Sequence, residues 1–366
     1  SHVCWKQNRP WLIPIVWVAI EGFRAYLPYL AFPWGITALP LWQFPYLAQS
    51  AAFGTIFMTS AWLVLGNVLI SIFLFPPKGE NFDKLPFGRV GVRMGMAFLA
   101  ILIISGLRFA TRPETQTVTM VVGQPGVDLA YTPDTDRPRL LQEAARQIIS
   151  TSLAVDSQLT IFPEGFAPAS HSLPPNNPIG PVPPVPVMFG GHRVEDGKTY
   201  QAAYAYDDHW QFADKTRLVI FGEYVPFRES LSFLKGFRLP AGDMVPSDVF
   251  TTVTVNKMRV GPLICFEGVF PDLAERHSQN GAQLLAQMSI DDWYVETPAW
   301  SQLWMSSVWR SIESGLPLLR VGGKGQSLAT DLRGSVIQMA PPGETVAMRV
   351  PVGLPEGSDA FAYRFA

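Results

Sequence analysis

Three short stretches of the chain place a reactive side chain beside an apolar, strand-like run. Glu164 follows the run at 159–162, Lys215 precedes the run at 218–221, and Cys265 ends the run at 259–265. Strand ends are where enzymes built on sheets place reactive groups. A thiol, a carboxylate that takes its proton and a cation that favours the thiolate can together perform nucleophilic catalysis. We therefore take these three residues as candidate catalytic groups and expect them to converge on one point.

Other kinds of site fit the sequence less well. Taken alone, a cysteine is more often a small core residue than a nucleophile, and single Glu and Lys residues beside strands are usually solvated. None of the five histidines neighbours a Gly-x-Ser-x-Gly turn, which disfavours a Ser-His-Asp hydrolase. No metal-ligand spacing is visible, so we expect neither a metal nor a cofactor.

The region from 113 to 366 alternates strand-like and helical patterns. Helical spacing of apolar residues predicts helices at 137–153 and 298–314. Runs rich in β-branched and apolar residues predict strands at 117–122, 159–162, 186–189, 200–206, 218–221, 250–255, 259–265, 284–289, 316–321, 327–331 and 346–350. The proline-rich segment 174–186 predicts a loop. This mixture over about 250 residues is typical of a layered α/β sandwich.

Composition separates a basic, apolar first third from an acidic remainder. Of the 366 residues, 48% are hydrophobic and only 16% charged. Residues 1–112 carry a net charge of +6, and residues 113–366 carry −8. The apolar content excludes intrinsic disorder, the acidic larger part excludes a nucleic-acid binder driven by net charge, and two cysteines exclude a disulfide scaffold. We predict two domains, with these same boundaries.

The first third has the pattern of a membrane region. Residues 25–77 contain no charged side chain, and 53–75 is the clearest transmembrane span. The proline- and tryptophan-rich stretch 27–45 indicates a broken helix or an interfacial loop. The loop 78–93, with four Lys/Arg and two Asp/Glu, is predicted to be cytoplasmic. The run 94–107 is short for a span, but one crossing there would place the rest of the chain outside. The alternative is a buried helical hairpin of a large soluble enzyme.

The three reactive residues and their neighbours resemble the nitrilase superfamily. Pro-Glu at 163–164, Lys-x-x-Leu-Val-x-Phe-Gly-Glu-Tyr-Val-Pro at 215–226 and Ile-Cys-Phe-Glu at 264–267 carry the likeness. The 221–226 motif after a charge-free segment is similar to the apolipoprotein N-acyltransferase branch. Glu-x-x-Arg at 21–24, Phe-Pro-Trp at 32–34, and the stretches 288–293 and 310–320 also resemble that family.

The resemblance implies a four-layer αββα nitrilase-like sandwich that follows an α-helical transmembrane region. It implies that Glu164 is the base, Lys215 the oxyanion-stabilising cation and Cys265 the nucleophile. Two further carboxylates, Glu223 and Glu267, would orient Lys215 or Glu164. The backbone N–H of Phe266 would be a second oxyanion donor, and Trp293 and Tyr131 are candidate substrate contacts.

The resemblance also implies substrates and a location. An acyl chain would leave a phospholipid, form a thioester on Cys265, and pass to the α-amino group of a diacylglyceryl-modified N-terminal cysteine of an apolipoprotein. We accordingly expect membrane lipids as partners, no nucleic acid, and a monomer. The expected location is the bacterial inner membrane, with several spans and a periplasmic catalytic domain.

The sequence departs from the family in three places. The family has about eight membrane helices, so we expect that helices preceding and following this sequence are missing from it. Ile290 stands where the family has Asn, and Gly-Gly-Lys-Gly at 322–325 replaces Thr-Asn-Thr-Gly. Two rival functions remain open: a membrane-anchored amidohydrolase acting on a small amide or nitrile, and a non-catalytic membrane scaffold. The intact Glu-Lys-Cys set disfavours the scaffold.

Overall fold

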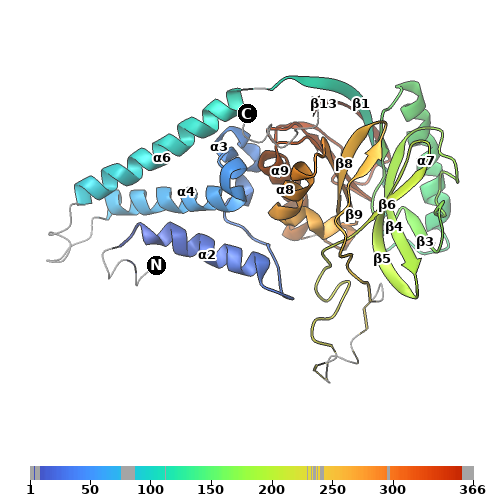
Figure 1. The fold of residues 1–366 in the computed structure, drawn as a ribbon, viewed down its shortest axis with the longest axis horizontal. Helices are drawn as coiled ribbons and strands as arrows, with labels where there is room; N and C mark the ends of the chain where they lie inside the picture. Colours follow the sequence, from blue (N-terminus) through green and yellow to red (C-terminus); the bar gives the residue numbers. More distant parts are fainter. Residues whose placement is uncertain are drawn as a thin grey trace. The chain divides into compact units, whose positions relative to one another are not determined.

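A computed structural model describes Cys4, residues 9–75, 87–111, 113–228, and residues 230–356 except 232, 234–235, 237, 240–242 and 295–296. Its contacts divide the chain into two compact units, Ser1–Arg112 (with Phe365–Ala366) and Pro113–Arg364. The elements of both are labelled in Figure 1.

The first unit is helical. It contains α2 (Leu12–Tyr26), the 3₁₀ helix η1 (Leu39–Gln43), α3 (Pro45–Ala48), α4 (Ala51–Leu74) and α6 (Phe87–Ala110). The proline-rich stretch 27–45 forms no long helix, as expected from its sequence. The segment after α2 turns back on it, because the Glu21 carboxylate accepts hydrogen bonds from the Thr37 N–H (2.8 Å) and hydroxyl (2.7 Å).

Two helices of the described residues are long and apolar enough to cross a membrane: α4 over Ala51–Leu74, and α6 over Gly91–Ala110. The run at 94–107 is therefore part of a longer helix than its charged flanks suggested. At 1.5 Å per residue, the 24 residues of α6 extend about 36 Å, enough for a bilayer core of about 30 Å. Arg93 does not end the helix, because arginine is a good helix former. Most of the loop at 78–93 lies outside the described residues.

The second unit is built from two sheets. The seven-stranded sheet has the order β13-β1-β2-β4-β5-β6, with β3 paired to β4; the six-stranded sheet has the order β12-β11-β10-β9-β8-β7. The strands of the first are β1 (Thr115–Gln124), β2 (Thr160–Ile161), β3 (Ala167–Ser170), β4 (Val187–Glu195), β5 (Lys198–Tyr206), β6 (Trp210–Asp214) and β13 (Val346–Pro355). Those of the second are β7 (Val253–Val255), β8 (Met258–Ile264), β9 (Leu284–Ser289), β10 (Leu318–Gly322), β11 (Leu328–Thr330) and β12 (Val336–Met339). In each sheet the central neighbours, β1-β2-β4 and β8-β9-β10, run parallel.

Helices cover both outer faces, which makes four layers. The two sheets share one core, to which Met120 and Ile161 contribute from the first sheet and Leu284 and Val321 from the second. Helix α7 (Arg137–Ala154) packs on the outer face of the first sheet. Helices α8 (Pro271–Gln279) and α9 (Pro298–Ser314) lie on the far side of the second sheet (Figure 1). The unit is the αββα sandwich that the family resemblance implies.

Most predicted elements are present, and one prediction is wrong. Helix α9 and strand β9 have the predicted bounds. The apolar run 218–221 is not a strand; it forms a tight turn bridged only between Ile220 and Tyr224. Its residues bond locally, because Glu223 folds back to accept the N–H of Val219 at 2.9 Å. Lys215 therefore follows strand β6, which was not predicted, rather than preceding a strand. Strands β3 and β12 and helix α8 were also missed.

We predict that packing of α7 on the first sheet contributes strongly to stability. Leu141→Ala removes a side chain that is 3% exposed, and should lower the unfolding free energy by about 2–5 kcal/mol. Leu153→Ala makes the same change on the same helix at a side chain that is 55% exposed. It should change the unfolding free energy by less than about 0.5 kcal/mol. Urea unfolding of the detergent-solubilised chain measures both. Equal losses would show that α7 does not pack as described.

Candidate active site

The structure brings Glu164, Lys215 and Cys265 together inside the second unit. Glu164 stands three residues after β2, Lys215 directly after β6, and Cys265 directly after β8. The Glu164 and Lys215 side chains are buried, and Cys265 is partly buried. The Cys265 thiol is close enough to the Glu164 carboxyl to lower the pKa of that group, and Lys215 acts electrostatically on both.

Close backbone packing holds Glu164. A Cβ atom at Gly190 would lie 2.6 Å from the Glu164 Cα, so that only glycine lets β4 approach this closely. Gly165 has φ +70°, a conformation that favours glycine, and a Cβ there would lie 2.7 Å from Ile290 Cδ1. The Ile290 N–H donates to Glu164 Oε2 at 3.0 Å. Burial raises the pKa of Glu164 to about 7, against the opposing effect of the Lys215 cation. A carboxyl with this pKa can both take and return a proton near neutral pH.

Lys215 is a buried cation with a matched counter-charge. Its backbone N–H donates to Gln201 O at 2.7 Å, and its Nζ donates to Glu223 Oε1 at 2.6 Å. Burial alone would lower the pKa of Lys215. The carboxylate of Glu223 above all, with Cys265 and Glu164 nearby, more than offsets burial and raises this pKa, so the ammonium stays protonated. Glu223 thus pairs with Lys215, and its role in orienting the lysine for a reaction stays a prediction.

Glu267, also expected to orient Lys215 or Glu164, bonds to groups on either side of the site, and its part in the reaction stays a prediction. Its Oε1 accepts from the Thr216 N–H (2.8 Å), the Thr216 hydroxyl (2.9 Å) and the Arg217 N–H (3.1 Å), and its Oε2 accepts from the Ile264 N–H (3.0 Å). These bonds join the segment after Lys215 to the end of β8. Glu267 therefore fixes backbone on either side of the site, through groups adjacent to the reactive residues.

The nucleophile candidate occupies a sharp turn. Cys265 has φ +53°, which is rare for a residue with a side chain, and begins the 3₁₀ helix η3 (Cys265–Val269). Burial raises the pKa of its thiol, and the charge of Glu164 adds to this effect while Lys215 opposes it. The buried Phe266 follows in the first turn of η3. Its role as an oxyanion donor stays a prediction.

The two aromatic residues named as substrate contacts lie against each other. The rings of Tyr131 and Trp293 pack edge to face, 5.6 Å between centroids, and are 66% and 50% exposed. Asp292 connects their segments, because its carboxylate accepts from the Leu129 N–H (2.8 Å) and the Lys324 N–H (3.1 Å). Burial raises the pKa of Asp292 to about 7. Lys324 lies in the stretch 322–325 that departs from the family pattern.

Sequence reasoning missed the residues that position the site through their backbone or through space. Gly190 and Gly191, side by side in strand β4, were a usable signal, since glycine inside a strand often marks a close approach. Thr216 and the backbone of Ile290 carried no signal, because any residue supplies an N–H and a threonine after a strand is common.

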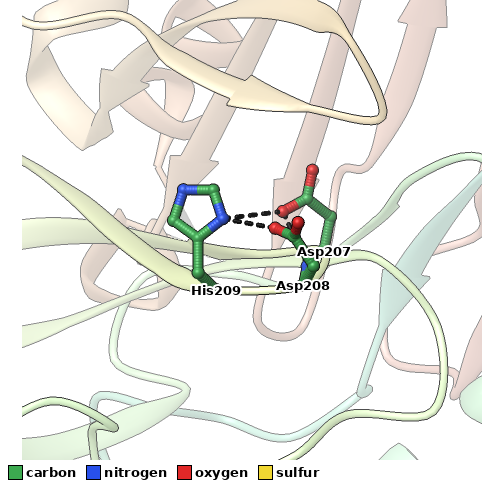
Figure 2. A group of neighbouring side chains, drawn as sticks. All are labelled: Asp207, Asp208 and His209. Carbon is green, nitrogen blue, oxygen red and sulfur yellow. Dashed lines mark hydrogen bonds and ion pairs between the residues drawn. The ribbon is translucent and has the colours of Figure 1, made fainter.

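One group of potential metal ligands occurs among the described residues. Asp207, Asp208 and His209 place their ligand atoms within 4.8 Å of one another at the β5–β6 turn (Figure 2). The turn precedes β6, whereas Lys215 follows it. The group comprises three consecutive residues of a surface turn, so we assign no metal to it.

Comparison with known proteins gives two family matches. Residues 2–69 match the apolipoprotein N-acyltransferase N-terminal domain, and residues 184–350 match the carbon-nitrogen hydrolase model. The apolipoprotein N-acyltransferase of Geobacter metallireducens is 26% identical over 95% of this chain and 69% of that protein. That of Allorhizobium ampelinum is 28% identical over 86% of this chain and 62% of that protein. The chain thus spans about two thirds of the length of these relatives.

Solved structures of the nitrilase superfamily are also similar to this chain. Saccharomyces cerevisiae Nit3 has a TM-score of 0.49 and 14% identity, and covers 66% of this chain and 93% of its own. An amidase from Nesterenkonia has a TM-score of 0.46 and 16% identity, and covers 68% of this chain and 95% of its own.

We predict that Glu164 sets the pH dependence of Cys265 reactivity. Only its ionised form can take the thiol proton, and with a pKa of about 7 that form grows as pH rises from 5 to 9. In a Cys4→Ser background, the rate of alkylation by iodoacetamide should therefore rise with a midpoint near pH 7. Glu164→Gln should move the midpoint to alkaline pH, toward that of the unassisted buried thiol.

The matched control is Glu143→Gln, which alters an exposed carboxylate of α7 paired with Arg139. Its alkylation midpoint should equal that of the unchanged chain. If Glu164→Gln leaves the midpoint near pH 7, the proton acceptor for Cys265 is another group.

Proposed function

We propose that the chain, like the apolipoprotein N-acyltransferases it is similar to, moves a fatty acyl chain from a phospholipid to a lipoprotein. The acceptor is the α-amino group of a diacylglyceryl-modified N-terminal cysteine, and the acyl chain passes through a thioester on Cys265. The observation that carries the proposal is the Cys265 thiol beside the buried carboxyl of Glu164, whose pKa is about 7, and the buried ammonium of Lys215.

The first half-reaction forms the acyl-enzyme. Glu164 takes the Cys265 proton as the sulfur attacks the ester carbonyl of the phospholipid. The carbonyl electrons move onto oxygen, and the Lys215 ammonium, with the Phe266 N–H, stabilises that oxyanion. When the C–O bond breaks, Glu164 returns the proton to the departing alkoxide, which leaves as a lysophospholipid.

The second half-reaction uses the same groups. The acceptor amine attacks the thioester carbonyl, Glu164 takes a proton from the nitrogen, and the C–S bond breaks. The sulfur regains the proton, and the product is an amide. In each half-reaction Glu164 first takes a proton and then returns it, which requires that its pKa lie near the working pH.

A lipid-facing site agrees with the other features of the chain. Helices α4 and α6 are long and apolar enough to hold the chain in a bilayer. The exposed rings of Tyr131 and Trp293 are candidates for contact with an acyl chain or headgroup. The amidohydrolase alternative has less support, because residues 2–69 match the N-acyltransferase N-terminal domain.

We predict that Cys265→Ser abolishes the acyl adduct and that Cys4→Ser does not. A serine hydroxyl is too weakly acidic for a carboxylate to activate at this site. Intact mass spectrometry after incubation with phospholipid should show one acyl chain added to the unchanged chain and to the Cys4→Ser variant. Adding a diacylglyceryl-cysteine peptide should transfer that mass to the peptide.

Two results would contradict this proposal. An adduct that persists in Cys265→Ser would show that another residue carries the acyl group. Release of free fatty acid in place of acylated peptide would identify water as the acceptor and favour the amidohydrolase alternative.

The proposed location is the bacterial inner membrane, with the second unit in the periplasm. The charge bias of the loop at 78–93 supports a cytoplasmic position for it, and one crossing by α6 would then leave Pro113 onward outside. In a Cys-free background, a cysteine introduced at Asp196, in the exposed turn between β4 and β5, should react with a membrane-impermeant thiol reagent in intact spheroplasts. One introduced at Lys84, which lies outside the described residues, should react only after lysis. The reverse pattern would remove the lipoprotein substrate from reach.

A further inference from the structure

A buried amide lies directly beneath the turn that carries Cys265. Gln287 belongs to β9, which pairs in parallel with β8, and its side chain is fully buried. Its Nε2 donates to the Cys265 carbonyl oxygen at 3.3 Å, and its Oε1 accepts from the Ser307 hydroxyl of α9 at 2.6 Å. Ser307 is also fully buried. A chain of hydrogen bonds therefore runs from α9 through β9 to the nucleophile turn.

The direction of this chain follows from chemistry. A backbone carbonyl only accepts hydrogen bonds, so the Gln287 group that faces Cys265 must be its NH₂. The amide oxygen is then left for Ser307, whose hydroxyl must donate. Ser307 thereby prevents the amide from turning over and presenting its oxygen to the carbonyl.

Glycine at position 268 makes room for this amide. A Cβ atom there would lie 2.0 Å from Gln287 Nε2 and 2.5 Å from its Cδ. Gly268 is not among the residues with positive φ, so the requirement for glycine is one of space and not of backbone conformation. Gly268 belongs to η3, the same short helix that begins with Cys265.

The hydrogen bond fixes more than a carbonyl. The peptide group joining Cys265 to Phe266 is planar and trans, so its C=O and N–H point in opposite directions. Holding the Cys265 oxygen toward Gln287 therefore aims the Phe266 N–H to the other side. Donation to the oxygen also polarises the peptide and strengthens its N–H as a donor. Since Cys265 adopts a rare conformation at φ +53°, this peptide group needs such an anchor.

We propose that Gln287, oriented by Ser307, is a positioning residue that aims the Phe266 N–H at the oxyanion. The inference rests on the proposed acyl transfer through Cys265. It assigns Gln287 a role in acylation only. The effects of Glu164 and Lys215 on the thiol do not pass through Gln287, so we expect both to persist when Gln287 is replaced.

Two reactions of the Cys265 thiol distinguish a role of Gln287 at the oxyanion from a general effect on the reactivity of the thiol. Acylation by an ester passes through an oxyanion, whereas alkylation by iodoacetamide displaces iodide and forms none. Gln287→Met retains a side chain of similar length without the donor. In the full chain in detergent, with Cys4→Ser, we expect it to slow acylation about 10- to 100-fold, both by phospholipid and by a p-nitrophenyl ester. Alkylation should stay within about twofold, with an unchanged pH profile.

Matched variants control for the substitution itself. Gln283→Met changes a nearby glutamine that bonds to Pro355 O, and should leave both rates unchanged. Ser307→Ala frees the Gln287 amide and should slow acylation several-fold. Ser306→Ala removes the adjacent hydroxyl, which bonds within its own helix to Leu303 O, and should not. Melting temperatures report whether each variant folds.

The outcomes distinguish this inference from the proposed function. Slowed acylation with normal alkylation supports the role of Gln287. Equal losses of both reactions, or no loss of either, would overturn it. If the unchanged chain reacts with the p-nitrophenyl ester but not with phospholipid, the proposed substrate is wrong while the inference about Gln287 stands. Acylation by neither donor would overturn both.

Discussion

The ammonium group of Lys215 is buried, and the arrangement of the site follows from keeping it charged there. An isolated cation in a protein interior is strongly destabilising unless a paired carboxylate compensates it. Glu223 supplies that charge at 2.6 Å, and the Val219 N–H holds the second oxygen of Glu223. The turn at 218–224 brings the Glu223 carboxylate back to Lys215. The cation in turn limits how far burial can raise the pKa of Glu164 and of the Cys265 thiol.

The two sheets position these charged groups, and the short connections after the strands set the orientation of their side chains. Glu164 and Lys215 follow strands of one sheet, and Cys265 follows a strand of the other. The site therefore forms only when the two sheets pack against each other in one relative position. Glu267 joins the segment after Lys215 to the end of β8, because it accepts three hydrogen bonds from Thr216 and Arg217 and one from Ile264. Gly190 and Gly268 admit a neighbouring backbone or side chain where any Cβ would collide. The shared core thus sets the distances, and backbone hydrogen bonds set the directions.

The sequence was sufficient to predict that Glu164, Lys215 and Cys265 lie together, because the motifs around them are local signals, and the family resemblance supplied the four layers. It misplaced Lys215 relative to its strand, since the apolar run at 218–221 has strand composition but bonds to its own turn. The length of α6 was underestimated because charged residues were taken as its limits, and backbone helicity does not stop at Arg93. Gln287 was not found at all. Its importance comes from a contact made across two strands, which no spacing along the chain encodes.

Proton transfer within the buried cluster moves charge without changing its total. In the proposed reaction, Glu164 takes the thiol proton, so that one negative charge passes from carboxylate to sulfur, and Lys215 acts on both positions. As the sulfur attacks, the charge moves again, onto the substrate oxygen, which must then meet donors already in place. Reorganising a buried polar site during the reaction would be costly, so its donors have to be held in advance. In the proposed reaction, the hydrogen bonds that Thr216 and Ile264 donate to Glu267, and that Gln287 donates to the Cys265 carbonyl, would hold the backbone around the site in place beforehand.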